Sequence, residues 1–246
     1  MRNYCKTLGT LAAVSALVAG KAAAEVEYEL HTGWSNEYLY RGLNLGHNLI
    51  EVGADVKAEV SGIGLSAGAW YGSFDNSKLP TVLKQDVGEL DLYAQVSKDF
   101  HILTGSVGYI YRYFESNGHD AKQENPPTQE IVFTLSRQIC YGVEGSLTYF
   151  WGVEGQNDGY SEFALSRSFE LSPCVALNCS TRLGYQIEQG QLSALTTKVS
   201  LDWAFVARAK LSPFVAYSIA LCDDPDTWYR GSENQLVGGM MLSVGF

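Results

Sequence analysis

Apolar and polar residues alternate along most of this 246-residue chain, in about twelve segments of roughly ten residues, and the last segment ends at Phe246. In the clearest segment, the apolar residues Ile50, Val52, Ala54, Val56, Ala58 and Val60 are separated by Glu51, Asp55, Lys57 and Glu59. Period-two alternation gives a β-strand one apolar face. Strands of this length that fill nearly the whole chain are typical of a transmembrane β-barrel.

The pattern predicts twelve strands, near residues 25–34, 49–60, 64–74, 87–98, 102–114, 128–138, 140–151, 160–170, 175–187, 193–206, 211–222 and 235–246. The connections alternate between tight links, at 61–63, 99–101, 138–140, 171–174 and 208–210, and longer polar links, at 35–48, 75–86, 115–127, 152–159, 188–191 and 223–234. We therefore expect an all-β fold, a closed antiparallel transmembrane barrel with short periplasmic turns and longer extracellular loops.

The N-terminus has the layout of a secretory signal peptide. Arg2 and Lys6 precede an apolar stretch at 8–19 and a small-residue site that ends at Ala24. We expect cleavage near Ala24, a barrel domain over 25–246 and a bacterial outer-membrane location. An uncleaved anchor is the alternative, but the stretch is shorter than the roughly 20 residues needed to span a membrane. Cleavage removes three cations and changes the net charge from -10 to -13, which argues against nucleic acid as a partner.

Aromatic residues of the apolar parity gather near both ends of the expected strands. The set near the long links is Trp34, Tyr71, Tyr111, Tyr113, Tyr149, Trp151 and Tyr185, and the set near the tight links is Tyr141, Trp203, Phe205 and Phe246. Such girdles lie at membrane interfaces, so the expected surroundings are outer-membrane lipid and lipopolysaccharide. A terminal Phe246 on an alternating strand also resembles the signal that the barrel-assembly machinery recognises.

The polar parity is expected to line the interior of the barrel. It carries eleven carboxylates and four cations, and the residues singled out as lumen-lining are Glu51, Asp55, Lys57, Glu89, Asp91, Arg112, Glu144, Arg182, Lys198 and Asp202. An acidic lumen with low-dielectric walls favours cations. The alternative is that these charges pair with one another and fill the interior, as Glu89 and Asp91 would do around Arg112. Arg167 breaks the parity near the inner rim, where a long side chain can reach water.

Several segments carry a family resemblance. They are residues 35–42 (SNEYLYRG), 61–73 (SGIGLSAGAWYGS), 89–94 (ELDLYA) and 108–114 (GYIYRYF). They resemble the TorF family of porin-like proteins, which implies an outer-membrane barrel. Arg41 in the first segment is a candidate for the pore mouth, where it would pair with interior carboxylates and set pore size or selectivity. The alternative is a turn arginine beside Gly42, which supplies an unusual backbone angle.

The remaining motifs favour no catalytic or metal site. Cys140, Cys174, Cys179 and Cys222 lack metal-ligand spacing, although the sequence leaves open a disulfide between Cys140 and Cys174. His31 with Glu29 and Glu51 is a conceivable reactive or metal cluster, but a hydrogen-bonded lumen histidine is favoured. We expect no cofactor and no enzymatic activity, since no nucleophile stands beside a matched histidine.

The function that the sequence predicts is a narrow, passive, cation-preferring channel for small solutes or ions. The alternatives are a non-conducting structural or binding barrel with a plugged lumen and, less favoured, a lipid-modifying enzyme.

Overall fold

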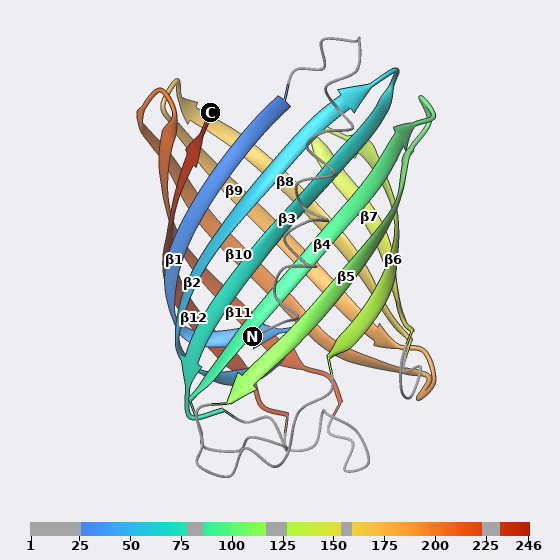
Figure 1. Ribbon diagram of the computed structural model, residues 1–246, viewed down its shortest axis with the longest axis vertical. Coiled ribbons are helices and arrows are strands. Elements are labelled where there is room, and N and C mark those ends of the chain that lie inside the picture. Colours follow the sequence, from blue (N-terminus) through green and yellow to red (C-terminus); the bar gives the residue numbers. More distant parts are fainter. Residues whose placement is uncertain (1–25, 78–85, 117–126, 154–158, 223–231) are drawn as a thin grey trace, which may run out of the picture.

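The computed structural model describes residues 26–77, 86–116, 127–153, 159–222 and 232–246. In these residues, twelve antiparallel strands form a closed barrel (Figure 1). The strands are β1 (Val26–Tyr40), β2 (Leu43–Val60), β3 (Ile63–Asp75), β4 (Val87–Asp99), β5 (Thr104–Ser116), β6 (Thr128–Cys140), β7 (Val143–Gly152), β8 (Tyr160–Ser172), β9 (Val175–Gln186), β10 (Gln191–Val206), β11 (Ala209–Ala220) and β12 (Gln235–Gly245). The predicted signal peptide at 1–24 lies outside the described residues. Among those described, no helix is both long and apolar enough to cross a membrane.

The first and last strands close the barrel. Strands β1 and β12 pair from Glu29 with Gly245 to Ser35 with Gly239. The backbone N–H of Phe246 donates to the carbonyl of Tyr28 at 2.9 Å, so the last residue of the chain extends this closing ladder. The predicted fold class and all twelve strands are confirmed, because period-two alternation is a local property that each strand carries by itself.

The outer face of the barrel is apolar. Large apolar side chains of one parity are about half exposed on every part of the wall, for example Leu30, Val52, Val96, Leu135, Leu147, Val199 and Val215. Aromatic side chains on the same face gather near the strand ends; Trp34, Tyr71, Tyr113, Trp151 and Tyr185 lie toward one end and Tyr141, Trp203 and Phe246 toward the other. A soluble barrel would not expose so much apolar surface.

The two ends of the barrel differ in their connections. At one end, here named the turn end, the links that follow β2, β4, β6, β8 and β10 contain two to four residues. At the other, the loop end, the links after β3, β5 and β11 are longer, while β9 and β10 are joined by only four residues, 187–190. The predicted alternation of short and long links therefore holds with one major exception, the link between β1 and β2.

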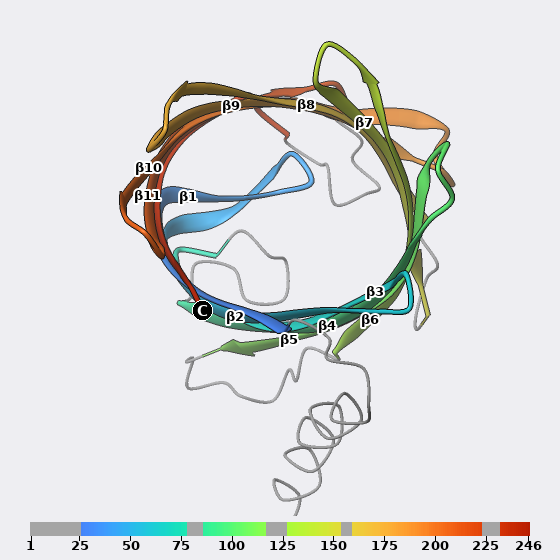
Figure 2. The ribbon, with the colours of Figure 1, turned by 90° about the horizontal axis from the view of Figure 1, so that it is seen from above.

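Residues 35–48, predicted as an outer loop, are a β-hairpin. Strands β1 and β2 continue past the barrel wall and meet at a two-residue turn, Arg41–Gly42. Pairing of β1 with β12 ends at Ser35, and beyond that point the hairpin bends into the barrel, as Figure 2 shows. We refer to residues 36–48 as the inner hairpin.

Local geometry explains both the turn and the bend. Arg41 and Gly42 have φ angles of 50° and 86°, the positive pair that a tight two-residue hairpin turn requires. Register shifts occur between Tyr38 and Leu39 and again after His47, and such bulges bend a strand. The prediction of an outer loop at 35–48 was wrong because this segment lacks the apolar alternation of the other strands. Its two strands pair with each other through backbone hydrogen bonds, which do not require that alternation.

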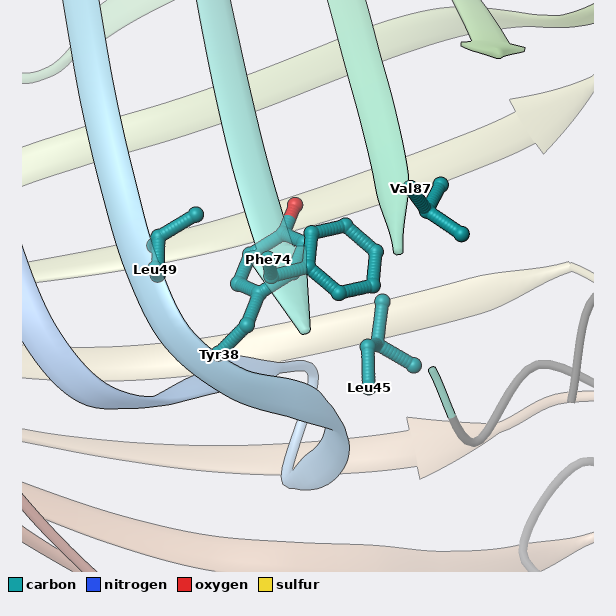
Figure 3. Close-up of a cluster of buried hydrophobic side chains, with 5 residues drawn as sticks. All are labelled: Tyr38, Leu45, Leu49, Phe74 and Val87. Atoms are coloured by element: carbon teal, nitrogen blue, oxygen red, sulfur yellow. The ribbon is translucent and has the colours of Figure 1, made fainter. Parts of the chain in front are cut away.

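An apolar cluster holds the base of the inner hairpin against the wall. Tyr38, Leu45 and Leu49 pack with Phe74 of β3 and Val87 of β4, and all five side chains are buried (Figure 3). The rings of Tyr38 and Phe74 lie 5.1 Å apart in a tilted arrangement. Full burial of an apolar side chain of this size contributes about 1.5–3 kcal/mol, so the cluster is a substantial anchor.

Candidate functional site

The tip of the inner hairpin contacts strand β10, which lies three strands from β1 around the barrel. A Cβ atom added to Gly42 would lie 2.2 Å from the Cβ of Ala194 on β10, which places the turn in direct contact with that strand. The hairpin starts between β12 and β3 and projects into the lumen (Figure 2). The hairpin therefore occupies part of the lumen at the level of Arg41 and Gly42.

Arg41 fixes the tip to a third part of the wall. Its guanidinium donates to both carboxylate oxygens of Glu130 on β6, at 2.8 Å each. The same group stacks on the rings of Tyr40, Phe150 and Tyr160, with 4.3–4.9 Å between its central carbon and the ring centroids. Cation–π contacts of this kind are worth about 0.5–2 kcal/mol each.

A second arginine, Arg112, contacts three carboxylates on the wall next to the hairpin tip. Arg112 on β5 lies 2.8 Å from Glu89 and 3.1 Å from Asp91, both on β4, and 3.8 Å from Glu130. It also donates a 2.9 Å hydrogen bond to the hydroxyl of Tyr40, on the hairpin. Glu89 has no exposed surface. These charged groups form one network that ties the hairpin to β4, β5 and β6.

Beneath the inner hairpin lies a cavity of about 300 Å³, here named the central pocket. Its lining includes Glu51 and Trp70 on one side and Arg182 and Lys198 on the other. The carboxylate of Glu51 accepts a 2.6 Å hydrogen bond from Trp70 Nε1. Arg182 lies 3.6 Å from Glu162, and Lys198 Nζ stands 4.1 Å from the ring centroid of Phe214.

A larger cavity of about 470 Å³ opens at the turn end. Asp55 and Lys57 line it, and Asp55 accepts a 2.6 Å hydrogen bond from the hydroxyl of Tyr93 and lies 3.4 Å from His31. Two further predicted lumen residues lie near this end. Asp202 forms an ion pair with Lys210 at 3.2 Å, and Glu144 is exposed beside the β6–β7 turn.

The structure thus divides the predicted lumen residues among three places. Glu89, Asp91 and Arg112 join Arg41 in the network behind the hairpin; Glu51, Arg182 and Lys198 line the central pocket; Asp55, Lys57, Glu144 and Asp202 lie toward the turn end. Sequence reasoning missed the interior aromatic residues Tyr40, Trp70, Tyr93, Phe150, Tyr160 and Phe214. For Tyr93, Phe150, Tyr160 and Phe214 the signal was an aromatic residue on the polar parity of the strand. Trp70 lies on a strand with small and apolar residues on both parities, and Tyr40 lies in the segment predicted as a loop.

The reactive groups form no recognisable metal or catalytic cluster in the part of the chain that the structure describes. No group of three or more His, Cys, Asp or Glu residues there is arranged to hold a metal ion. The four cysteines within these ranges are free thiols, and no disulfide joins Cys140 to Cys174. His31 faces Asp55, not the Glu29–Glu51 cluster that the sequence suggested.

The fold is shared with solved outer-membrane channels. The KdgM porin matches with a TM-score of 0.53 and 10% sequence identity, covering 89% of this chain and 99% of that one. The COG4313 outer membrane channel from Pseudomonas putida F1 matches with a TM-score of 0.56 and 9% identity, covering 92% and 96%. The NanC porin gives 0.52 and 10%, covering 89% and 98%. At these identities the likeness establishes the fold alone.

The sequence comparisons define the family but no activity. No curated protein matches the chain. Residues 19–232 match a family described as a bacterial protein of unknown function, which spans all of the described strands except the last. The chain therefore belongs to the Gcw_chp family.

Proposed function

We propose that this protein is an outer-membrane, porin-like channel through which small solutes or ions diffuse passively. The observation that carries the proposal is the division of the wall into an apolar outer face and a charged interior around a closed barrel. A mid-membrane Arg or Lys on the outer face would cost about 2–4 kcal/mol. The outward-parity cations Lys98, Arg137 and Arg167 all lie near the turn end, outside that central zone.

The same division supports an orientation. The short turns would face the periplasm and the loop end the outside, after removal of the signal peptide at 1–24. Outer-membrane lipid and lipopolysaccharide would surround the aromatic girdles, and Phe246 would present the chain to the barrel-assembly machinery. The TorF-like segments between 35 and 114 include the inner hairpin and the strands that anchor it, so the resemblance fits this proposal.

The inner hairpin would set the width of the channel. It projects into the lumen and is held by Glu130, by Ala194 and by the apolar cluster at its base. Solutes would pass beside the hairpin through the central pocket and the turn-end cavity. Selection would depend on size and charge, with no chemical step.

Cation preference would come from the carboxylates that no cation neutralises. Within the described residues, no cationic nitrogen of Lys or Arg lies within 4.0 Å of Glu27, Glu29, Glu51 or Asp55. Three of them, Glu27, Glu29 and Asp55, line the turn-end cavity. Lys57, Arg208 and Lys210 line the same cavity, so the excess of negative charge belongs to the interior as a whole, with eleven carboxylates and four cations on the polar parity. A water-filled passage with an excess of negative charge concentrates cations.

Conductance of the refolded protein in a planar bilayer under a salt gradient tests the proposal. The expected result is discrete current steps with a reversal potential whose sign shows that cations pass more readily than anions. A folded barrel that gives no steps would overturn the channel. Steps with an anion-selective reversal potential would overturn the cation preference and leave the channel standing.

One observation favours a second candidate, a barrel plugged by its own hairpin. The hairpin tip touches β10 inside the barrel, and its arginine is paired with Glu130 and stacked on Phe150. Because Ser35 pairs with Leu49, a two-residue Asn-Gly turn can replace residues 36–48 without changing the register of β1 and β2. A silent wild type together with a conducting shortened variant would identify the hairpin as a plug.

A further inference from the structure

The central pocket contains positive and negative side chains on different sides, and Lys198 and Glu51 form no ion pair with each other. It is roofed by the inner hairpin, through Tyr38, Leu39 and Arg41, and walled by β2, β3 and β8–β12. Its volume of about 300 Å³ is at the lower end of the range for small-molecule sites. A space of this size accommodates one small solute.

The positive side of the pocket consists of two neighbouring cations. In the β9–β10 register Arg182 pairs with Thr196 and Ser180 with Lys198, so the two cations are diagonal neighbours on adjacent strands. The Arg182 side chain is 60% exposed and has one carboxylate, Glu162, at 3.6 Å. Within the described residues, no carboxylate oxygen lies within 4.0 Å of Lys198 Nζ. Both cations are therefore available to a solute.

Three carboxylates line the pocket. Glu162 pairs with Arg182 and Glu37 lies 3.9 Å from His47, so, in the part of the chain that the structure describes, the one with no cationic side chain beside it is Glu51 on β2. Its side chain lies over Gly33, where an added Cβ would be 3.0 Å from Glu51 Oε1. Its other oxygen accepts the indole N–H of Trp70 at 2.6 Å. This uncharged donor holds the carboxylate in place without neutralising it, so Glu51 keeps its full charge toward the pocket.

The rest of the lining contains apolar and aromatic side chains together with the hydroxyls of Ser35, Ser180 and Thr196. Phe214, under Lys198, and Met241, beside Gly33 on the barrel wall, both line the pocket, and so do Leu49 and Val237. A lone anion or cation would meet attraction on one side and repulsion on the other. A solute that carries both charges satisfies both sides at once, and its body contacts the apolar side chains of the lining.

We propose that the central pocket binds a zwitterionic solute of amino-acid size, with its carboxylate at Arg182 and Lys198 and its ammonium at Glu51. The inference deepens the proposed function, on which it rests for the passage of the solute. It assigns the pocket as the point where the channel recognises what it carries.

The test is isothermal titration of the refolded protein in detergent micelles with three molecules of one skeleton. Phenylalanine carries both charges, 3-phenyllactate lacks the ammonium, and phenylalaninamide, at a pH where its amine is charged, lacks the carboxylate. Phenylalanine is expected to bind at least about tenfold tighter than either analogue, a difference of about 1.4 kcal/mol. If phenyllactate binds as tightly as phenylalanine, the pocket is an anion site. If phenylalaninamide binds as tightly, it is a cation site. Either result, or no binding of any of the three molecules, overturns the proposal.

Two variants assign the charges. Glu51→Gln should abolish the preference for phenylalanine over phenyllactate, and Lys198→Met the preference over phenylalaninamide. Glu59→Gln, exposed at the turn end, and Lys98→Met, on the outward parity, are matched controls that should leave phenylalanine binding unchanged. Far-UV circular dichroism verifies that each variant is folded. If the single substitutions leave all three affinities unchanged, the assignment is wrong.

Titration does not require conduction, so the two proposals fail separately. Phenylalanine binding without conductance would overturn the channel and leave the binding site. Conductance without phenylalanine binding would overturn the binding site and leave the channel.

Discussion

At the loop end of the barrel, Glu89 has no exposed surface and Arg112 contacts three carboxylates, whereas at the turn end Asp55 and Lys57 line an open cavity of about 470 Å³. Both sets of residues have the same strand parity and the same chemistry. The difference arises because the inner hairpin covers the first set and removes it from water. Charges at the loop end therefore maintain structure, and charges at the turn end remain free to act on ions.

Removing the guanidinium of Arg112 should have the largest effect. Arg112→Met leaves Glu89 and Asp91 close together without a cation, while Glu130 keeps its ion pair with Arg41. Breaking a buried ion pair from one side costs about 3–5 kcal/mol. The midpoint of unfolding in denaturant should fall accordingly. Arg137→Met, an exposed residue on the outward parity, is the control that should leave the midpoint nearly unchanged. Equal midpoints for the two variants would contradict the distinction drawn between the ends.

The contact at the hairpin tip can be tested with a pair of glycines. Gly42 and Gly62 both have positive φ, 86° and 75°, but an added Cβ meets Ala194 at Gly42 and nothing within 4 Å at Gly62. Gly42→Ala should therefore displace the tip and increase single-channel conductance. Gly62→Ala carries a similar backbone strain of about 1–3 kcal/mol and should leave conductance unchanged. Identical conductance in both variants would show that the tip does not limit the passage.

The anchor at Arg41 should contribute less than the network at Arg112. Arg41→Gln removes the ion pair with Glu130 and the stacking on Phe150 and Tyr160. We expect a loss of about 2–3 kcal/mol in unfolding free energy, less than for Arg112 because Glu130 keeps its 3.8 Å contact with Arg112, and more frequent current fluctuations as the hairpin loosens. Arg167→Gln is a suitable control, because Arg167 also stacks on a ring, Phe169, but on the outward parity. A current trace as quiet as the wild type would argue against Arg41 as the anchor.

The smallest expected effect is on ion selectivity. Neutralising Glu29 and Asp55 together should shift the reversal potential toward zero while preserving the fold, because both line the open cavity. Neutralising Glu89 and Asp91 should instead lower stability, since Arg112 would then keep only the 3.8 Å contact with Glu130. If the second pair changed selectivity as strongly as the first at unchanged stability, the passage would run through the network at the loop end.

How far the sequence could predict the site depended on the range of the interactions. The strand positions and the interior parity of Glu51, Asp55 and Arg112 follow from alternation within single strands. The pairing of Arg112 with Glu89 and Asp91 on the adjacent strand was predicted from the same parity and is confirmed. The other partners of these residues were not predicted, because they come from other strands. Arg41 and Glu130 are 89 positions apart, and the indole of Trp70 reaches Glu51 from the next strand. The interior position of Trp70 was also hidden, because small and apolar residues occupy both parities of its strand.

Period-two alternation, strand length and turn residues were enough to determine a twelve-stranded closed barrel with an apolar exterior. The reason is that the sequence of each strand alone shows which side chains are apolar and face outward and which are polar and face inward. The inward path of residues 36–48 was decided only in the tertiary structure. Register shifts between Tyr38 and Leu39 and after His47 bend the hairpin into the lumen. Contacts with Phe74, Glu130 and Ala194 hold it there. Those contacts join residues distant in sequence, and no local pattern of residues encodes them.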